Sequence, residues 1–369
     1  MIAITLALVG LSFVISFAAT AAIRGIAPKI GFVDRPGHRK IHHVPRPLGG
    51  GVAIFAGLAV PMLAGLLYAN SAGPPGRLEA LATHWEGIRA QSPLALKFLL
   101  AMLLMHLLGL ADDRRAMGPF IKLLIQLGIT TLFVLWADVR AVTFLDNYGL
   151  GVVPSVIVTV LWITGIANAF NFLDNMDGLS AGVAAVCAAA FLVTTLSIGQ
   201  WFVAAVLALL LGALIGFLCF NFPPASIFMG DSGSLLIGLV LGVLTIRTTY
   251  LPAGADLAAG WYAIFAPLIV LAVPLYDMIV VSCIRIARGR SPFVGDTNHF
   301  SHRLVARGMS RRTAVLCIWL ITAATSVGAM LLPHVRTTFT AVLVFAQTLL
   351  ILGVVMLLER HPLPNAQET

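Results

Sequence analysis

The sequence predicts an all-α, polytopic integral membrane protein, and three observations support this prediction. Of its 369 residues, 59% are hydrophobic and 10% are charged, whereas about a quarter of the residues in a soluble domain are charged. The apolar residues form about eleven runs, each close to the roughly 20 residues that a helix needs to cross a hydrocarbon core. Most of the basic residues fall between these runs, which disfavours both a nucleic-acid-binding surface and a disordered chain.

The expected spans follow one another along almost the whole chain. In order, they cover residues 2–23, 49–69, 93–111, 119–137, 152–170, 179–198, 201–220, 234–250, 261–284, 313–332 and 338–358. The break between the sixth and seventh runs is the least marked, so we expect ten or eleven helices. Because no long linker and no fixed-period repeat divides the chain, residues 1–369 are expected to form one membrane domain.

The distribution of basic residues predicts how the spans are oriented. Most of the 23 lysines and arginines lie in loops after odd-numbered runs and in the C-terminal tail. Because these residues accumulate on the cytoplasmic side, the N-terminus is expected outside and the C-terminus in the cytoplasm. Arg24 follows the first run and no basic residue precedes it, which favours a retained span over a signal peptide. The loops expected in the cytoplasm are residues 24–48, 112–118, 171–178, 221–233 and 285–312.

Acidic residues are concentrated in or beside the same five loops, although no topology rule requires them there. A carboxylate near membrane depth is costly unless it is paired or functional. Their concentration on one face therefore predicts a functional site. These residues are Asp34, Asp112, Asp113, Asp174, Asp177, Asp231 and Asp296.

The adjacent pair Asp112 and Asp113 ends an apolar run, with Arg114, Arg115 and Lys122 close behind. Adjacent residues on a helix point about 100° apart, so one carboxylate could bind a metal ion while the other handles a proton. A charge cluster at a helix end, balanced by its arginines, is the plainer alternative.

A second polar cluster interrupts the fifth run in the segment NAFNFLDNMDGLSAG. Asn168, Asn171 and Asp174 follow at a spacing of three, which places them on one face if the segment is helical. A polar turn with helix caps explains Asn175 and Asp177, but it does not explain the first three. This cluster therefore favours a functional role.

The segment NFPPASIFMGDSGS brings Asn221, Phe228 and Asp231 to the start of the next apolar run. A helix N-terminus with small residues and an aspartate suits phosphate oxygens bridged by Mg²⁺. A helix that ends at proline, followed by an aspartate N-cap, explains the same residues equally well.

The last of the five loops carries Asp296, His299, His302 and Arg303. One helical turn would place the two histidines on one side with the arginine adjacent. Imidazoles beside arginines suit an anionic pyrophosphate, and zinc is disfavoured because no cysteine or third close histidine completes a tetrahedral set. A basic stretch lying against lipid phosphates is the alternative.

Other polar residues within the apolar runs have structural explanations. Asp277 is expected to be buried and paired, and His106 is expected to be structural. The four cysteines are expected to be free thiols, because they lie in apolar stretches without the C-x-x-C spacing; they are Cys187, Cys219, Cys283 and Cys317.

Five motifs, in this order and spacing, resemble those of the polyprenyl-phosphate N-acetylhexosamine-1-phosphate transferases, the MraY/WecA family. The motifs are VDRPGHRKIHH…PLGG, DD, NAFNFLDNMDGL, NFPPASIFMGDSGS and DTNHFSHRL, and they extend through nearly the whole chain. The resemblance implies a multi-pass protein of the bacterial inner membrane with its active site on the cytoplasmic face. It also implies Mg²⁺, with Mn²⁺ as a substitute, and transfer of a sugar 1-phosphate from a UDP-sugar to undecaprenyl phosphate with release of UMP.

The resemblance further implies roles for individual residues. Asp112 and Asp113 match paired aspartates, one of which deprotonates the lipid phosphate or attacks as a nucleophile. Asp231, together with Asp112, is expected to bind the metal ion. The residues expected at the nucleotide sugar are Asn171, Asp174, Asp177, Asn221, Phe228 and Lys40, and those expected at the pyrophosphate or sugar are His299, His302 and Arg303.

Three departures from the family pattern are present. Phe300 and Ser301 stand between the two histidines, where the family usually has a further histidine, and this departure bears on the role of the histidine motif. The other two bear on the donor: Ala116 replaces a lysine of the peptidoglycan branch, and the Pro-Met-His-His-His string of that branch is absent. We therefore expect GlcNAc-1-phosphate and a surface polysaccharide rather than the phospho-MurNAc-pentapeptide of peptidoglycan synthesis, which remains an alternative.

An alternative from a different class is a secondary transporter. A transporter would place its charged groups near the membrane midplane in broken helices, and it would show an internal repeat. The expected partners of the transferase are a UDP-N-acetylhexosamine, undecaprenyl phosphate and the lipid bilayer, without nucleic acid; a homodimer is left open.

Overall fold

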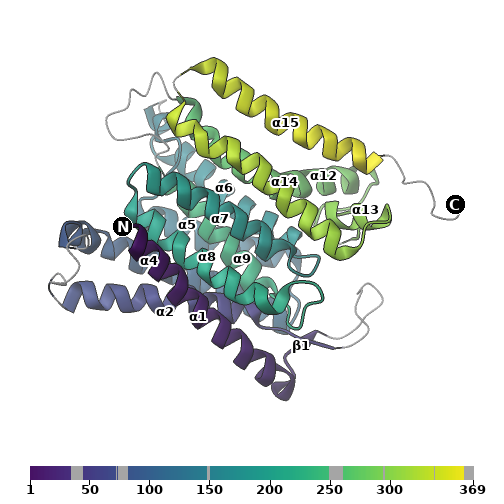
Figure 1. Cartoon of the computed structure of the whole chain (residues 1–369), viewed down its shortest axis with the longest axis horizontal. Coiled ribbons are helices and arrows are strands. Elements are labelled where there is room, and N and C mark those ends of the chain that lie inside the picture. The colour runs from purple at the N-terminus through teal and green to yellow at the C-terminus, as the bar shows by residue number, and fades with distance from the viewer. Residues whose placement is uncertain are drawn as a thin grey trace, which may run out of the picture.

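The computed structural model describes residues 1–34, 45–71, 73, 82–147, 150–248, 261–293, 296–335 and 337–360, and these ranges are helical almost throughout (Figure 1). The helices are α1 (Ile2–Ile26), α2 (Gly50–Ser71), α4 (Trp85–Arg114), α5 (Pro119–Ala137), α6 (Val153–Leu173), α7 (Leu179–Ser197), α8 (Trp201–Asn221), α9 (Asp231–Arg247), α11 (Ala266–Val270), α12 (Ala272–Ala287), α13 (Phe300–Ala306), α14 (Arg311–Leu331) and α15 (Thr338–Arg360). Short 3₁₀ turns are η1 (Ala27–Ile30), η2 (Thr143–Asn147), η3 (Trp261–Phe265) and η4 (Leu332–His334). Strands β1 (Val33–Asp34) and β2 (Arg46–Pro47) form an antiparallel pair.

The expected spans are found as helices, and the prediction of an all-α, polytopic membrane protein is confirmed. In the described ranges, nine helices are long and apolar enough to cross a membrane. Of the two other expected spans, α9 has 17 residues, and the segment expected at 261–284 is divided into η3, α11 and α12. The division falls at Leu271, three residues before Pro274, whose nitrogen cannot donate to the preceding helical turn.

Helix α9 lies at the centre of the bundle and is buried from Ser232 to Thr245, with α2, α4 and α6 packed around it. The contact between α4 and the start of α9 depends on glycine. A Cβ atom on Gly109 would lie 2.4 Å from the backbone oxygen of Asp231, a distance that two such atoms do not adopt. This close approach brings the paired aspartates of α4 next to the first residue of α9.

The five loops expected in the cytoplasm meet at one end of the bundle. Strand β1 and helix α13 lie at this end, and the N-terminus lies at the opposite end (Figure 1). Helix boundaries differ slightly from those expected from the sequence. Helix α4 continues to Arg114, so Asp112 and Asp113 belong to its last turn, and Asp231 is already the first residue of α9.

Candidate active site

A cavity of about 830 Å³ opens where the five loops meet, and each loop contributes to its lining. Eight of the residues expected at the site line this cavity: Asp112, Asp113, Asp174, Asp177, Asn221, Phe228, Asp231 and His302. Further charged residues in the lining are Asp34, Arg46, Asp296 and Arg311. The clustering of loop carboxylates that was predicted from the sequence is therefore present in space.

Asp113 fixes the start of α9. Its Oδ1 accepts a hydrogen bond from the backbone nitrogen of Asp231 at 2.7 Å, and its Oδ2 accepts one from the nitrogen of Ser232 at 3.1 Å. The side chain thus satisfies two of the free N–H groups at the helix N-terminus. The sequence suggested Asp231 as an N-cap; instead Gly230 occupies that position, and the capping carboxylate comes from α4.

Lys122 on α5 lies between the carboxylates of Asp112 and Asp231. Its Nζ lies 2.5 Å from Asp231 Oδ2 and 3.3 Å from Asp112 Oδ2. Asn171 on α6 donates a second hydrogen bond to Asp231, from Nδ2 to Oδ1 at 2.8 Å. Asp231 is thereby held from two helices, with a cation and an amide on its two oxygens.

Lys122 lies close behind the paired aspartates in the sequence, but it was not predicted to belong to the site. The signal was available, because a single lysine inside the apolar run at 119–137 is costly at that depth unless it has a partner or a function. Arg46 and Arg311 also line the cavity. The sequence alone could not distinguish them from the many other basic residues of their loops.

Asp174 follows the end of α6 and lies among other carboxylates. Loss of water around its carboxylate raises its pKa well above the usual value, and the negative charges of Asp231, Asp113 and Asp177 raise it further. Such an excess of negative charge disfavours full ionisation unless a cation is close by. The cavity is therefore suited to a positively charged ligand on its carboxylate side.

Asp177, Asn221 and Phe228 hold the loop that leads to α9. Asp177 Oδ2 accepts from the nitrogen of Ala225 at 2.9 Å. Asn221 accepts from the nitrogen of Gly178 and donates to the oxygen of Ile227, both at 2.9 Å. The backbone of Phe228 pairs with Pro47 and Gly50. These residues line the cavity and also fix its wall.

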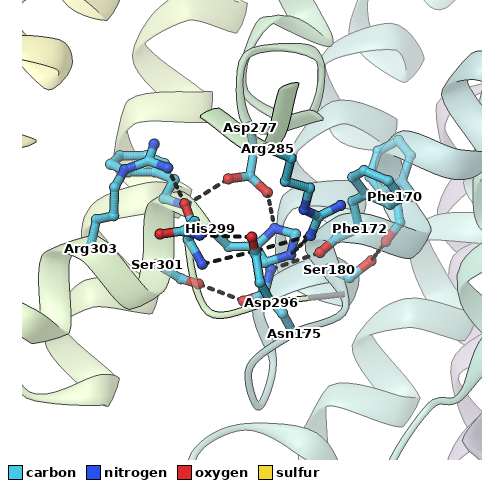
Figure 2. A network of polar contacts seen from close by, with 12 residues as sticks. Phe170, Phe172, Asn175, Ser180, Asp277, Arg285, Asp296, His299, Ser301 and Arg303 are labelled. Atoms are coloured by element: carbon cyan, nitrogen blue, oxygen red, sulfur yellow. Dashed lines mark hydrogen bonds and ion pairs between the residues drawn. The ribbon is translucent and has the colours of Figure 1, made fainter. Parts of the chain in front are cut away.

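The three residues expected at the pyrophosphate or sugar have different surroundings in the structure. His302 lines the cavity, and desolvation followed by the neighbouring His299 lowers its pKa. His299 is buried against Asp277 instead, with Nδ1 2.8 Å from Oδ2 (Figure 2). Nη2 of Arg303 donates to both carboxylate oxygens of Glu359 on α15, at 2.8 and 2.9 Å. Of the three, only His302 is in the cavity lining.

Two further predictions are confirmed by the structure. His106 is structural, as expected: it is buried, and its Nδ1 lies 3.0 Å from the backbone oxygen of Ser232. All four cysteines are free thiols. Lys40, expected at the nucleotide sugar, lies outside the described residues.

Comparison with known proteins gives the family. The profile of glycosyl transferase family 4 matches residues 95–249. A probable undecaprenyl-phosphate N-acetylglucosaminyl 1-phosphate transferase of Bacillus subtilis is 33% identical over 317 residues, covering 85% of this chain and 80% of that protein. A decaprenyl-phosphate N-acetylglucosaminephosphotransferase of Mycolicibacterium smegmatis is 33% identical over 344 residues, covering 88% and 81%.

A more distant relative is the undecaprenyl-phosphate alpha-N-acetylglucosaminyl 1-phosphate transferase of Thermotoga maritima, 28% identical over 305 residues and covering 83% of each chain. The chain belongs to glycosyl transferase family 4, the family of membrane transferases that its sequence motifs resemble. The transporter alternative is therefore set aside.

Proposed function

We propose that this protein transfers N-acetylglucosamine 1-phosphate from UDP-GlcNAc to undecaprenyl phosphate, releases UMP, and so begins a lipid-linked surface polysaccharide. The observation that supports this proposal most is the junction of Asp112, Asp231 and Lys122 in the wall of a cavity at one end of a membrane bundle. The names of the relatives supply the substrate class, a polyprenyl phosphate and an N-acetylglucosaminyl phosphate.

The proposed reaction is a phosphoryl transfer. A phosphate oxygen of undecaprenyl phosphate attacks the β-phosphorus of the UDP-sugar, the bond from that phosphorus to the bridging oxygen breaks, and UMP leaves with the bond's electron pair. Two anionic substrates must therefore approach each other. Catalysis of such a step depends mainly on positioning and on stabilising the charge of the phosphoryl oxygens.

Lys122 is placed to supply positive charge to the reacting phosphates. Its ammonium group lies between Asp112 and Asp231, and it can exchange one of these contacts for a phosphate oxygen when the substrates bind. Arg46, Arg311 and His302 line the same cavity. We assign them to the diphosphate of the donor, because a guanidinium group can bind two phosphate oxygens at once and an imidazole N–H can donate one further hydrogen bond.

The two adjacent aspartates take different roles in this proposal. Both oxygens of Asp113 are engaged by the backbone of α9, so this residue positions Asp231. Asp112 also accepts from the nitrogen of Met117 at 2.6 Å, but its Oδ2 faces Lys122. We therefore assign to Asp112 the contact with the acceptor phosphate, as the base that takes its proton.

Mg²⁺ is the proposed cofactor, and Mn²⁺ its substitute. In the described part of the chain, no three histidine, cysteine, aspartate or glutamate side chains converge as a preformed metal site. The donor set still fits, because Mg²⁺ commonly takes one or two carboxylates and completes its shell with water and substrate phosphates. Asp231 and Asp112 would hold the ion, which would neutralise charge on the diphosphate.

A donor panel tests the proposal. The purified protein is incubated with undecaprenyl phosphate, MgCl₂ and one radiolabelled donor: UDP-GlcNAc, UDP-GalNAc or UDP-MurNAc-pentapeptide. We expect label in the organic phase with UDP-GlcNAc, and its loss with EDTA or in Asp231→Asn, because a neutral amide is a poor Mg²⁺ ligand. The proposal would be contradicted if only UDP-MurNAc-pentapeptide gave label in the organic phase, or if none of the three donors did.

A further inference from the structure

The carboxylate of Asp277 on α12 anchors the start of α13, in the segment between α12 and α14. Asp277 on α12 has no exposed surface. Its Oδ2 lies 2.8 Å from Nδ1 of His299, and its Oδ1 accepts from the backbone nitrogen of Phe300 at 2.6 Å. His299 is the N-cap residue of α13, so both contacts act on the first turn of that helix.

The opposite edge of the His299 ring is engaged as well. Its Nε2 lies 3.4 Å from Nη2 of Arg285, which is 2% exposed and also donates to Asp296 Oδ1 at 3.1 Å (Figure 2). Because arginine can only donate, Nε2 is the acceptor and the ring proton lies on Nδ1, toward Asp277. Neither ring nitrogen of His299 is free to meet a substrate.

The residues on either side of His299 do face the cavity. Asp296, Thr297 and His302 are in its lining. Hydrogen bonds from Arg285 and Asn298 hold the pKa of Asp296 well below its usual range, although desolvation opposes this. The buried network therefore ends on groups that line the site, and it sets the direction in which His302 leaves the first turn of α13.

We propose that Asp277 and His299 are positioning residues, which orient the first turn of α13 so that His302 and the Asp296–Thr297 segment meet the donor. His299 then acts on the reaction through the loop and not by contact with the substrate. This inference rests on the proposed function, because it takes the cavity as the donor site.

The alternative is that His299 itself touches the substrate. The two roles can be distinguished by a substitution that keeps the hydrogen bond to Asp277 but removes the imidazole ring. Asparagine can place an N–H near the position of Nδ1 and so keep the bond to Asp277, but it has no imidazole for acid–base chemistry. Alanine removes both. His299→Asn and His299→Ala are therefore the matched pair, with Asp277→Ala as the partner variant.

The test measures kcat and KM for UDP-GlcNAc, together with UDP-GlcNAc binding by calorimetry, on variants that elute as folded protein. We expect Asp277→Ala and His299→Ala to lower kcat/KM about 10- to 100-fold, the size of effect that small displacements produce, with weaker donor binding. His299→Asn should stay within about threefold of wild type. The double variant Asp277→Ala/His299→Ala should be no worse than the poorer single variant, because each single variant already breaks the contact between Asp277 and His299.

Asp146→Asn serves as a control, since Asp146 pairs with Arg140 in the loop after α5, outside the cavity lining, and this variant should keep wild-type activity. The inference is overturned if His299→Asn is as impaired as His299→Ala, or if Asp277→Ala keeps wild-type kcat/KM. Failure of the proposed function is a separate result, because wild-type protein would then form no lipid-linked sugar from UDP-GlcNAc.

Discussion

Lys122 shows how much one residue can determine in this site. It is the cation between Asp112 and Asp231, and without it two partly buried carboxylates would face each other with no positive charge between them. Repulsion of this kind is costly where water is scarce. The lysine therefore holds the two carboxylates together, and in the proposed reaction it also supplies charge for the substrate phosphates.

We predict that Lys122→Met lowers kcat about 100-fold or more, the size of effect expected when one charge that stabilises the transition state is lost. Initial rates with saturating UDP-GlcNAc measure this, and size-exclusion chromatography checks that the variant is folded. Lys97→Met is the matched control, since Lys97 bonds the backbone oxygen of Trp136 outside the cavity lining. Equal rates for both variants would show that Lys122 has no role in the reaction.

The sequence revealed the carboxylates but not their partners. Asp112, Asp174 and Asp231 were found because acidic residues are unexpected at a membrane edge. The engagement of His299 by Asp277 was not foreseen, because the two lie 22 positions apart and the pairing depends on how α13 folds back onto α12. Spacing along the chain gives a shared helix face at best, and it does not say which way that face points.

At the scale of elements, the start of α9 depends on a glycine. Gly230 has a φ of +75°, and a Cβ atom there would lie 2.5 Å from Asp113 Oδ2. An alanine would be strained and would displace the carboxylate that caps α9.

We predict that Gly230→Ala destabilises the protein by about 1–3 kcal/mol and lowers activity, measured as the melting temperature and the initial rate. Gly10→Ala is the control, because apart from the neighbouring backbone of α1 itself no atom lies within 4 Å of a Cβ atom placed on Gly10. A melting temperature for Gly230→Ala equal to that of the control would refute this account of the α4–α9 contact.

A second element-scale feature is the polar contact between α5 and α6, one turn from Lys122. Asn168 Nδ2 donates to Gln126 Oε1 at 2.6 Å, and Gln126 is fully buried. Asn168 was singled out in the sequence because a polar turn could not explain it. The structure gives it a partner within the bundle, outside the cavity lining.

We predict that Asn168→Leu destabilises the protein by about 1–3 kcal/mol, because it leaves the buried Gln126 amide without its partner. The double variant Gln126→Leu/Asn168→Leu should recover most of this loss, since replacing both polar groups can be nearly neutral. Thermal unfolding in one detergent measures both. A double variant that is less stable than the single variant would contradict a simple paired contact.

At the scale of the whole molecule, the charge pattern and the helical bundle agree. The loops grouped by their basic and acidic residues meet at one end of the bundle, and their side chains line one cavity. This part of the fold was predictable, because the length of an apolar run and the positive-inside rule are properties of the chain and the membrane together. The break at Leu271 was not, since a run of apolar residues looks the same whether or not the helix is continuous.

The orientation of the bundle is a prediction of its own. With basic loops at the end that carries the cavity, a reporter fused to the C-terminus should lie in the cytoplasm. Green fluorescent protein should fluoresce there, and alkaline phosphatase should be inactive. The reverse pattern would place the cavity on the outer face, where cytoplasmic UDP-GlcNAc does not reach it.

The most direct test of the proposed reaction follows the β-phosphorus. The protein is given UDP-GlcNAc labelled with ¹⁴C in the sugar and ³²P in the β-phosphate, together with undecaprenyl phosphate and MgCl₂. The transfer of a sugar 1-phosphate predicts both labels in the lipid fraction in the ratio of the donor, with UMP in the aqueous phase. If the ³²P instead stayed in the aqueous phase as UDP while the ¹⁴C entered the lipid, the protein would transfer a sugar without its phosphate, and the account would be wrong.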